Sequence, residues 1–378
     1  MIVPLFLLLL AQAAPADEAS IAERYHEVDQ QRQACWSTKD WACVENVLEG
    51  MLVDPDFRQI PALYRNTLYN LACAHALQGE RAEALRRLAE SVDAGYDNYI
   101  GTRFDSDFTD LRGDSTFVWI LDGMRRSLGV TWDPARSTNP PTIRTDRMTV
   151  PELVQLRSQY ELDQVVAGAA DDYERVRRIT SWTHGRWSHN GNNEPSQPDP
   201  LTILREAGEG KMFRCVEYGT VVAGAARALG MPARVLALKT HDVETRPSGA
   251  GHVVAEVWLR DQKKWIFADG QFDVIPERDG RPLSGSEFAE AMWDGGDLPE
   301  CRSTSQASCS DYLRWVTPYL YYLDYSLDQR MFVSKQEGSL MMVPKGAPDP
   351  KVFQQRWPIG PCTYISDPLV FNRPPEGE

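Results

Sequence analysis

The stretch FRCVEYGTVVAGAARALGMPARVLAL, residues 213–238, decides the fold of the central part of this 378-residue chain. Small and apolar residues recur in it at helical spacing, and Gly230 and Pro232 close the run. Glycine is favoured just past the end of a helix and proline cannot continue one. We therefore predict a helix that begins near Cys215. The short β-branched segment 233–238 that follows predicts a strand.

A cysteine at the start of a helix lies in surroundings that favour a reactive thiol. Unpaired backbone N–H groups and the positive end of the helix dipole stabilise a thiolate there. The same N–H groups can bind a developing oxyanion. Cys215 is therefore a candidate nucleophile, although a cysteine in an Ala/Val-rich helix is most often a small core residue.

A nucleophilic thiol also needs a base and a group that orients the base. His252 opens the predicted strand HVVAEVWL, and Asp269 ends the predicted strand KKWIFADG. A hairpin that turns at residues 260–261 pairs His252 directly with Asp269 and sets Val254 beside Phe267. Side chains directly opposite each other have Cβ atoms about 5 Å apart. The carboxylate can then accept a hydrogen bond from the imidazole and hold its tautomer.

Four segments, in this order and at this spacing, resemble the transglutaminase-like superfamily, which are thiol enzymes of the papain-like fold. The segments are GKMFRCVEYG at 210–219, ALGMPARV at 228–235, GHVVAEVW at 251–258 and KWIFADG at 264–270. The resemblance extends over residues 160–288, about a third of the chain. It implies an α+β domain in which a helix packs on an antiparallel sheet.

The resemblance also implies a role for each reactive residue. Cys215 is expected to be the nucleophile, His252 the general base and acid, and Asp269 the residue that orients the imidazole. Trp187 is a candidate side-chain partner of the oxyanion, and Trp182 competes with it for that role. The implied reaction is acyl transfer through a Cys thioester. Hydrolysis of an amide or peptide bond is the first expectation, and protein-glutamine cross-linking is the alternative.

Residues 17–130 have apolar side chains at three- and four-residue intervals, with Gly or Pro between the runs, which predicts an all-helical domain. The segment LYNLACAHALQGERAEALRRLAESVDAG resembles a tetratricopeptide repeat. A poorer copy precedes it at residues 24–55, with Cys43 in the position of Ala84. We expect such an array to dock or brace a protein partner. A plain helical bundle is the alternative.

The N-terminus and the cysteines predict export. An apolar run followed by alanine-rich cleavage sites is typical of a signal peptide, here residues 1–16, and a buried N-terminal strand is the alternative. Cys35 with Cys43, and Cys301 with Cys309, are each eight residues apart and could close disulfide loops. These features predict a periplasmic or secreted protein.

The remaining segments complete the predicted layout. The Pro- and Thr-rich segment 131–150 predicts a linker, residues 151–290 the catalytic domain, and residues 291–378 a β-rich C-terminal extension. His184 and His189 are predicted to lie at a solvated helix end.

Composition narrows the range of partners. A net charge of −14 argues against binding to nucleic acid, and no apolar run in the mature chain is long enough to span a membrane. The sequence has no HExxH motif for zinc and no GxSxG motif for a serine nucleophile. No metal and no other cofactor is expected. A protein or peptide substrate is predicted. The competing class is a non-catalytic binding scaffold that uses the helical repeats.

Overall fold

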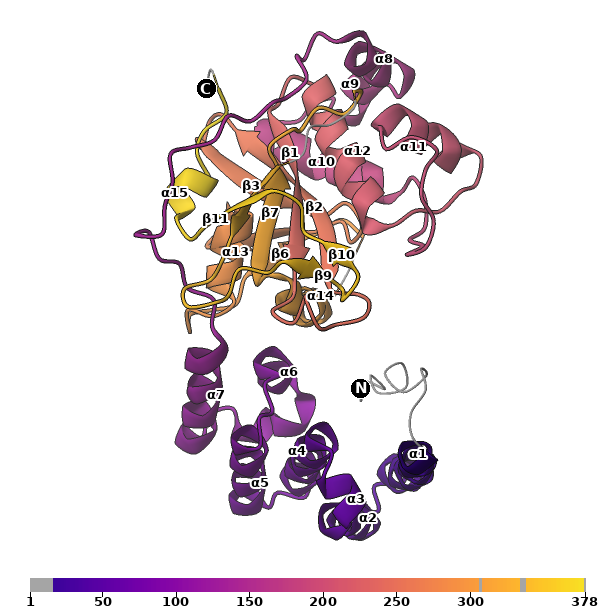
Figure 1. The fold of residues 1–378 in the computed structure, drawn as a ribbon, viewed down its shortest axis with the longest axis vertical. Coiled ribbons are helices and arrows are strands. Elements are labelled where there is room, and N and C mark those ends of the chain that lie inside the picture. The colour runs from indigo at the N-terminus through magenta and orange to yellow at the C-terminus, as the bar shows by residue number, and fades with distance from the viewer. Residues whose placement is uncertain (1–15, 306–307, 334–337, 377–378) are drawn as a thin grey trace. The chain divides into compact units, whose positions relative to one another are not determined.

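The computed structural model of the protein describes residues 16–305, 308–333 and 338–376. The chain divides into two compact units, with the boundary between Leu128 and Gly129 (Figure 1). The signal peptide predicted at residues 1–16 lies outside the described residues, apart from Ala16. None of the helices in the described part of the chain is both long and apolar enough to cross a bilayer.

The N-terminal unit consists of helices and turns over its described residues. Its helices are α1 (Ala16–Ser37), α2 (Trp41–Val53), α3 (Pro55–Arg58), α4 (Pro61–Leu77), α5 (Arg81–Asp93), α6 (Tyr99–Phe104), the 3-10 helix η1 (Ser106–Leu111) and α7 (Ser115–Leu128). Apolar faces of α4 and α5 pack together, as the helical spacing predicts.

The helix pairs α1–α2 and α4–α5 turn in the same way, which is consistent with helical repeats. Asp40 and Glu80 each donate their backbone N–H to the carbonyl five residues earlier, at 2.9 Å in both cases. The residue before each of them has a left-handed φ, as this type of helix end requires. The matching turns lie 40 residues apart, so the predicted alignment of Cys43 with Ala84 is wrong by one residue. Val44 takes that position, and both it and Ala84 are fully buried.

Cys43, which does not take the position equivalent to Ala84, forms a disulfide. It bonds to Cys35 across the α1–α2 turn, and Cys301 bonds to Cys309, so both predicted disulfides are confirmed. The three free cysteines are Cys73, which is buried, and Cys215 and Cys362, which are partly exposed.

The second unit contains the sheet and nine further helical segments among its described residues. Its helices are α8 (Pro151–Gln159), α9 (Leu162–Val165), α10 (Asp172–His184), α11 (Pro200–Gly208), α12 (Cys215–Ala228), α13 (Gly285–Ala291), α14 (Cys309–Val316), η2 (Thr317–Tyr319) and α15 (Pro368–Phe371). Its strands are β1 (Ala233–Lys239), β2 (Gly251–Leu259), β3 (Lys264–Ala268), β4 (Ile275–Arg278), β5 (Arg281–Pro282), β6 (Glu300–Arg302), β7 (Tyr322–Ser326), β8 (Ser339–Met342), β9 (Val352–Phe353), β10 (Trp357–Pro358) and β11 (Cys362–Ile365).

Six strands form the main sheet in the order β11-β8-β7-β1-β2-β3. All neighbours are antiparallel except β11 and β8, which run parallel. The segment 291–378, predicted as a β-rich extension, supplies β7, β8 and β11 and so builds half of this sheet. The unit is therefore an α+β fold, as the sequence predicts.

Helices cover both faces of the sheet (Figure 1). On one face α12 packs on β1 and β2, and Ala255 and Val257 lie in one apolar cluster with residues of α12. On the other face, the first residue of α13, Gly285, donates its N–H to Glu256 of β2 at 2.8 Å. Successive residues of a strand point to opposite faces, so β2 is buried between two helical layers.

The predicted linker, 131–150, is extended and bound along the second unit. Arg144 forms an isolated β-bridge with Asp328, and its backbone N–H donates to the carbonyl of Leu327 at 2.8 Å. At the start of the segment, the carbonyl of Thr131 accepts the backbone N–H of Lys345 at 2.8 Å. These bonds hold the segment against the strands that the C-terminal part of the chain supplies.

Candidate active site

Helix α12 sets the position of Cys215. The helix begins at this residue, and Glu217 in its first turn accepts the backbone N–H of Arg214 at 3.0 Å and its guanidinium at 2.8 Å. At the other end Gly230 has a φ of +83°, and Met231 donates its N–H to the carbonyl of Ala226 at 2.9 Å. The predicted helix is confirmed at both ends. Cys215 is partly exposed, whereas every residue of the helix from Glu217 to Ala228 is buried.

A glycine brings the first turn of α12 close to β2. A Cβ atom on Gly219 would lie only 2.8 Å from the carbonyl oxygen of Val254. Real Cβ atoms do not approach a backbone oxygen so closely, so a larger residue would push the helix away from the strand. The missing side chain therefore lets the thiol end of α12 lie near the start of β2, where His252 is found.

His252 and Asp269 are in contact, with 2.7 Å between the imidazole Nε2 and the carboxylate Oδ2. Their predicted register is nevertheless wrong. The turn between β2 and β3 has four residues, 260–263, and Phe267 pairs with Glu256 instead of Val254. Continued by one residue, this register sets Asp269 opposite Val254 and diagonal to His252. Diagonal neighbours are still within reach of long side chains, which is why the contact survives the shift.

Asp269 is fully buried and accepts four hydrogen bonds. Besides His252, Oδ2 accepts from the hydroxyl of Tyr312 at 2.9 Å. Oδ1 accepts from the backbone N–H groups of Gln271 and Phe272 at 3.0 and 3.2 Å. Such an acceptor set satisfies a buried carboxylate and holds it in one orientation. Tyr312 lies on α14, and no sequence pattern near the cysteine indicates it.

The electrostatics of the site favour a protonated imidazole. Burial of the His252 ring lowers its pKa, but the charge of Asp269 and hydrogen bonds with Asp269 and Cys215 outweigh burial and raise the pKa to about 9. Because Nε2 faces Asp269, Nδ1 is the ring nitrogen left for the thiol. The contact with Asp269 therefore favours the protonated form of the imidazole.

The indole ring of Trp187 packs against one aromatic residue that precedes Cys215 in the sequence and one that follows it. Its ring lies 5.9 Å from Phe213 and 4.3 Å from Tyr218, between ring centroids. The tyrosine hydroxyl donates to the backbone carbonyl of Trp187 at 2.6 Å. The indole Nε1 is buried and has no hydrogen-bond partner among the described residues. Trp182, the competing candidate, instead packs against Tyr160 at 6.2 Å.

The two histidines near Trp187 differ in their surroundings. His184 ends α10, and its Nδ1 makes a 2.8 Å hydrogen bond with the carbonyl of Gln271, beside Asp269. His189 lies beyond the helix and pairs with Phe213 in an isolated β-bridge. Burial and the positive charge of His252 lower its pKa. His189 is solvent-exposed, as predicted, but it lies beyond the end of α10 and not at it, because the loop folds back onto the residues before Cys215.

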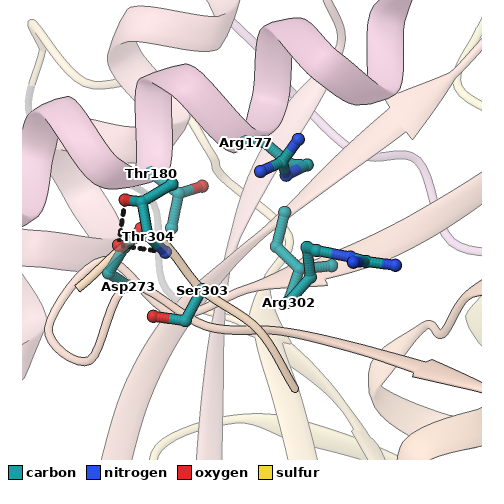
Figure 2. Close-up of a pocket in the computed structure, with 7 residues that line it drawn as sticks. Arg177, Thr180, Asp273, Arg302, Ser303 and Thr304 are labelled. Atoms are coloured by element: carbon teal, nitrogen blue, oxygen red, sulfur yellow. Dashed lines mark hydrogen bonds between the residues drawn. The ribbon is translucent and has the colours of Figure 1, made fainter. Parts of the chain in front are cut away.

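Figure 2 shows a small hollow that is lined mainly by polar side chains. It lies between α10, which carries Arg177, and the segment after β6, which carries Thr304. Both arginines that line it are in ion pairs, Arg177 with Glu174 and Arg302 with Glu277. The lining includes neither Cys215 nor His252.

Two groups of side chains among the described residues place three possible metal-ligating atoms within 4.8 Å of one another. They are Glu45, His75 and Glu80, and Cys73, Asp105 and Asp107. Direct hydrogen bonds already join members of each group. His75 bonds to Glu80 at 2.7 Å, and the Cys73 thiol donates to Asp105 at 3.9 Å. Both groups belong to the N-terminal unit and neither contains a residue of the candidate site.

Comparison with known proteins identifies the family that the central residues resemble. Residues 161–270, which include Cys215, His252 and Asp269, match the model of the transglutaminase-like superfamily. No curated protein matches the chain. Among solved structures, a protein from Cytophaga hutchinsonii, named as a candidate cysteine protease, is 17% identical with a TM-score of 0.27. That match covers 48% of this chain and 63% of the other, which is just under two thirds of its length.

Proposed function

Because residues 161–270 form a domain of the transglutaminase-like superfamily, we propose that this chain is a thiol enzyme that transfers acyl groups through Cys215. The observation that carries the proposal is the 2.7 Å contact of the His252 imidazole with the buried Asp269 carboxylate, and the pKa of the same imidazole is also raised by Cys215. A nucleophile, a base and an orienting group in contact are what this chemistry requires.

In the first half of the proposed reaction, the Cys215 thiolate attacks the carbonyl carbon of an amide or peptide bond. A C–S bond forms, and the carbonyl oxygen becomes an oxyanion. The protonated His252 then gives its proton to the departing nitrogen, the C–N bond breaks, and a thioester remains. Asp269 stays ionised throughout and stabilises the imidazolium without taking its proton.

Two kinds of donor are available for the oxyanion. The N–H groups at the start of α12 have no partner within the helix, and the helix dipole is positive at this end. The indole N–H of Trp187 is buried without a partner beside the same residues, which supports its proposed role as a side-chain donor. Trp182 is not retained for this role, because its ring packs on Tyr160.

In the second half, neutral His252 removes a proton from water, and the resulting hydroxide attacks the thioester. The products are the carboxylic acid and the free thiol, so the enzyme acts as a hydrolase. An amine in place of water would instead form a new amide, as in protein-glutamine cross-linking. We propose hydrolysis, because Cys215 is partly exposed and water can reach the thioester.

Selective alkylation tests the proposed thiol chemistry. We expect iodoacetamide at pH 7 to modify Cys215 much faster than Cys73 and Cys362, which serve as internal references. Burial raises the pKa of both reference thiols, so they should remain largely unreactive. His252→Ala should remove the advantage of Cys215. Equal, slow labelling of all three thiols would favour a non-catalytic scaffold instead.

Turnover is tested with a library of peptides and carboxamides, with Cys215→Ala as the inert control. Release of ammonia or a peptide fragment that depends on Cys215 supports hydrolysis. The same assay with a fluorescent amine separates the two acceptors, because incorporation of the amine would show transfer. If neither product depends on Cys215, the enzymatic proposal fails.

We further propose that the protein works in an oxidising compartment, periplasmic or extracellular, where its two disulfides are stable. The helical repeats of the N-terminal unit would dock a protein partner there. Fractionation of cells that express the full chain with a C-terminal tag tests the location. Recovery of the protein in the cytoplasm with reduced cysteines would contradict it.

A further inference from the structure

Three partly exposed aromatic residues, Phe272, Trp315 and Tyr319, surround the imidazole of His252, and we call them the aromatic wall. We propose that this wall binds a large apolar side chain of the substrate, aromatic by preference, on the residue that supplies the reacting carbonyl. The inference rests on the proposed function and names the substrate class of the same site.

The wall is a continuous set of ring contacts that ends on the reactive imidazole. Trp315 lies at its centre, 4.4 Å from Phe272 and 5.0 Å from Tyr319 between ring centroids. The edge-to-face contact of Trp315 with His252 has a centroid distance of 4.9 Å. The other two rings each lie 6.1 Å from the imidazole. These distances are those of interacting aromatic pairs.

Trp315 lies beside the buried face of its helix and not on it. Helix α14 buries Tyr312, Leu313 and Val316, which are spaced for one helical face. Trp315 lies off that face, and 37% of it is exposed. A large apolar side chain kept at the surface beside a reactive group indicates a ligand contact, since exposed apolar surface gains free energy when a ligand covers it.

The wall also lies near the proposed nucleophile. Burial raises the pKa of the Tyr319 hydroxyl, and a negative charge on Cys215 raises it further. The Tyr319 ring contacts both Trp315 and His252, the imidazole proposed to act with Cys215. A carbonyl carbon attacked by the thiolate must come close to the imidazole, so the atoms attached to that carbon must pass the wall.

The chemistry of the wall favours one class of side chain. An aromatic or large aliphatic group can cover the exposed indole and pack on the neighbouring rings. Burial of a side chain such as Phe or Leu strengthens binding by on the order of 10- to 100-fold relative to a small polar one. We expect this preference in kcat/KM, because the contact persists while the thioester forms.

The test uses two peptidyl coumarin amides that differ only in the residue that supplies the carbonyl, Phe or Ser. The wild-type protein should cleave the Phe peptide at least 10-fold more efficiently in kcat/KM. In Trp315→Ala the Phe/Ser ratio should fall close to one, and Trp315→Phe should restore most of it. Trp357→Ala is the matched control, because Trp357 is also an exposed tryptophan of this unit and should leave the ratio unchanged.

Binding to Cys215→Ala separates the two proposals. Fluorescence anisotropy with the same peptides, labelled at their N-terminus, should show tighter binding of the Phe peptide, and adding Trp315→Ala should remove the difference. If the wild-type protein binds the Phe peptide selectively but does not turn it over, the proposed function is wrong and the proposed binding role of the aromatic wall is supported. If both peptides are turned over with equal efficiency, the proposed binding role of the aromatic wall is wrong and the proposed function is supported. Circular dichroism of each variant excludes loss of folding as the cause.

Discussion

Replacing Asp269 by Asn tests whether the carboxylate holds the proton on His252. The pKa of the buried ring is raised from 6.5 to about 9, although burial by itself lowers it. That difference corresponds to roughly 300-fold tighter proton binding, or about 3 kcal/mol. In Asp269→Asn the charge is lost while burial remains, so we expect the pKa of His252 to fall below 6.5. The ring would then be mostly neutral at pH 7.

The sign of the stability change follows from the same difference. The folded pKa of His252 exceeds the unfolded value, so protonation stabilises the folded state. This contribution is fully present below about pH 6.5 and is lost as the pH rises through about 9. The wild-type protein should therefore lose up to about 3 kcal/mol of unfolding free energy over that window. Asp269→Asn should lack this dependence.

Titration of the imidazole C–H resonances by NMR measures the pKa directly. The chain has six histidines, and a His252→Gln spectrum assigns the relevant signal. Asp273→Asn is the matched control, since Asp273 is a buried carboxylate on the same loop that accepts hydrogen bonds from Thr304 and Ser305 instead. A midpoint in Asp269→Asn within about half a unit of the wild-type value would refute this electrostatic account.

Three further substitutions test the framework of the site. Tyr312→Phe removes a 2.9 Å hydrogen bond to Asp269 and should lower the free energy of unfolding by about 1.5–3 kcal/mol and reduce kcat, measured by urea denaturation and peptide turnover. Gly219→Ala should cost about 1–3 kcal/mol, because the added carbon meets the backbone of β2, and an unchanged urea midpoint would contradict that close approach. Glu256→Gln leaves the buried Arg234 without its charged partner and should cost about 3–5 kcal/mol in the same assay, with a loss below 1 kcal/mol counting against the ion pair.

The ion pair between Arg234 and Glu256 illustrates what sequence patterns leave out. Both side chains are buried, and the guanidinium also donates to the carbonyl of Phe371 at 2.9 Å and lies 4.2 Å from the ring centroid of Tyr325. In the sequence, Arg234 and Glu256 are only polar residues within predicted strands. Their pairing depends on the alignment of β1 with β2 and on the return of the C-terminal segment to the sheet.

Local patterns determined the helix at Cys215 and the strands that carry His252 and precede Asp269, because helix ends and strand periodicity depend on neighbouring residues. The register of the hairpin depends on the length of its turn. The sequence pattern predicted a turn of two residues, and the structure has four. Tyr312 reaches Asp269, and Trp315 reaches His252, only because α14 folds back after more than 40 residues of chain. Such contacts between distant segments are set by packing of the whole unit, so only the tertiary structure decided them.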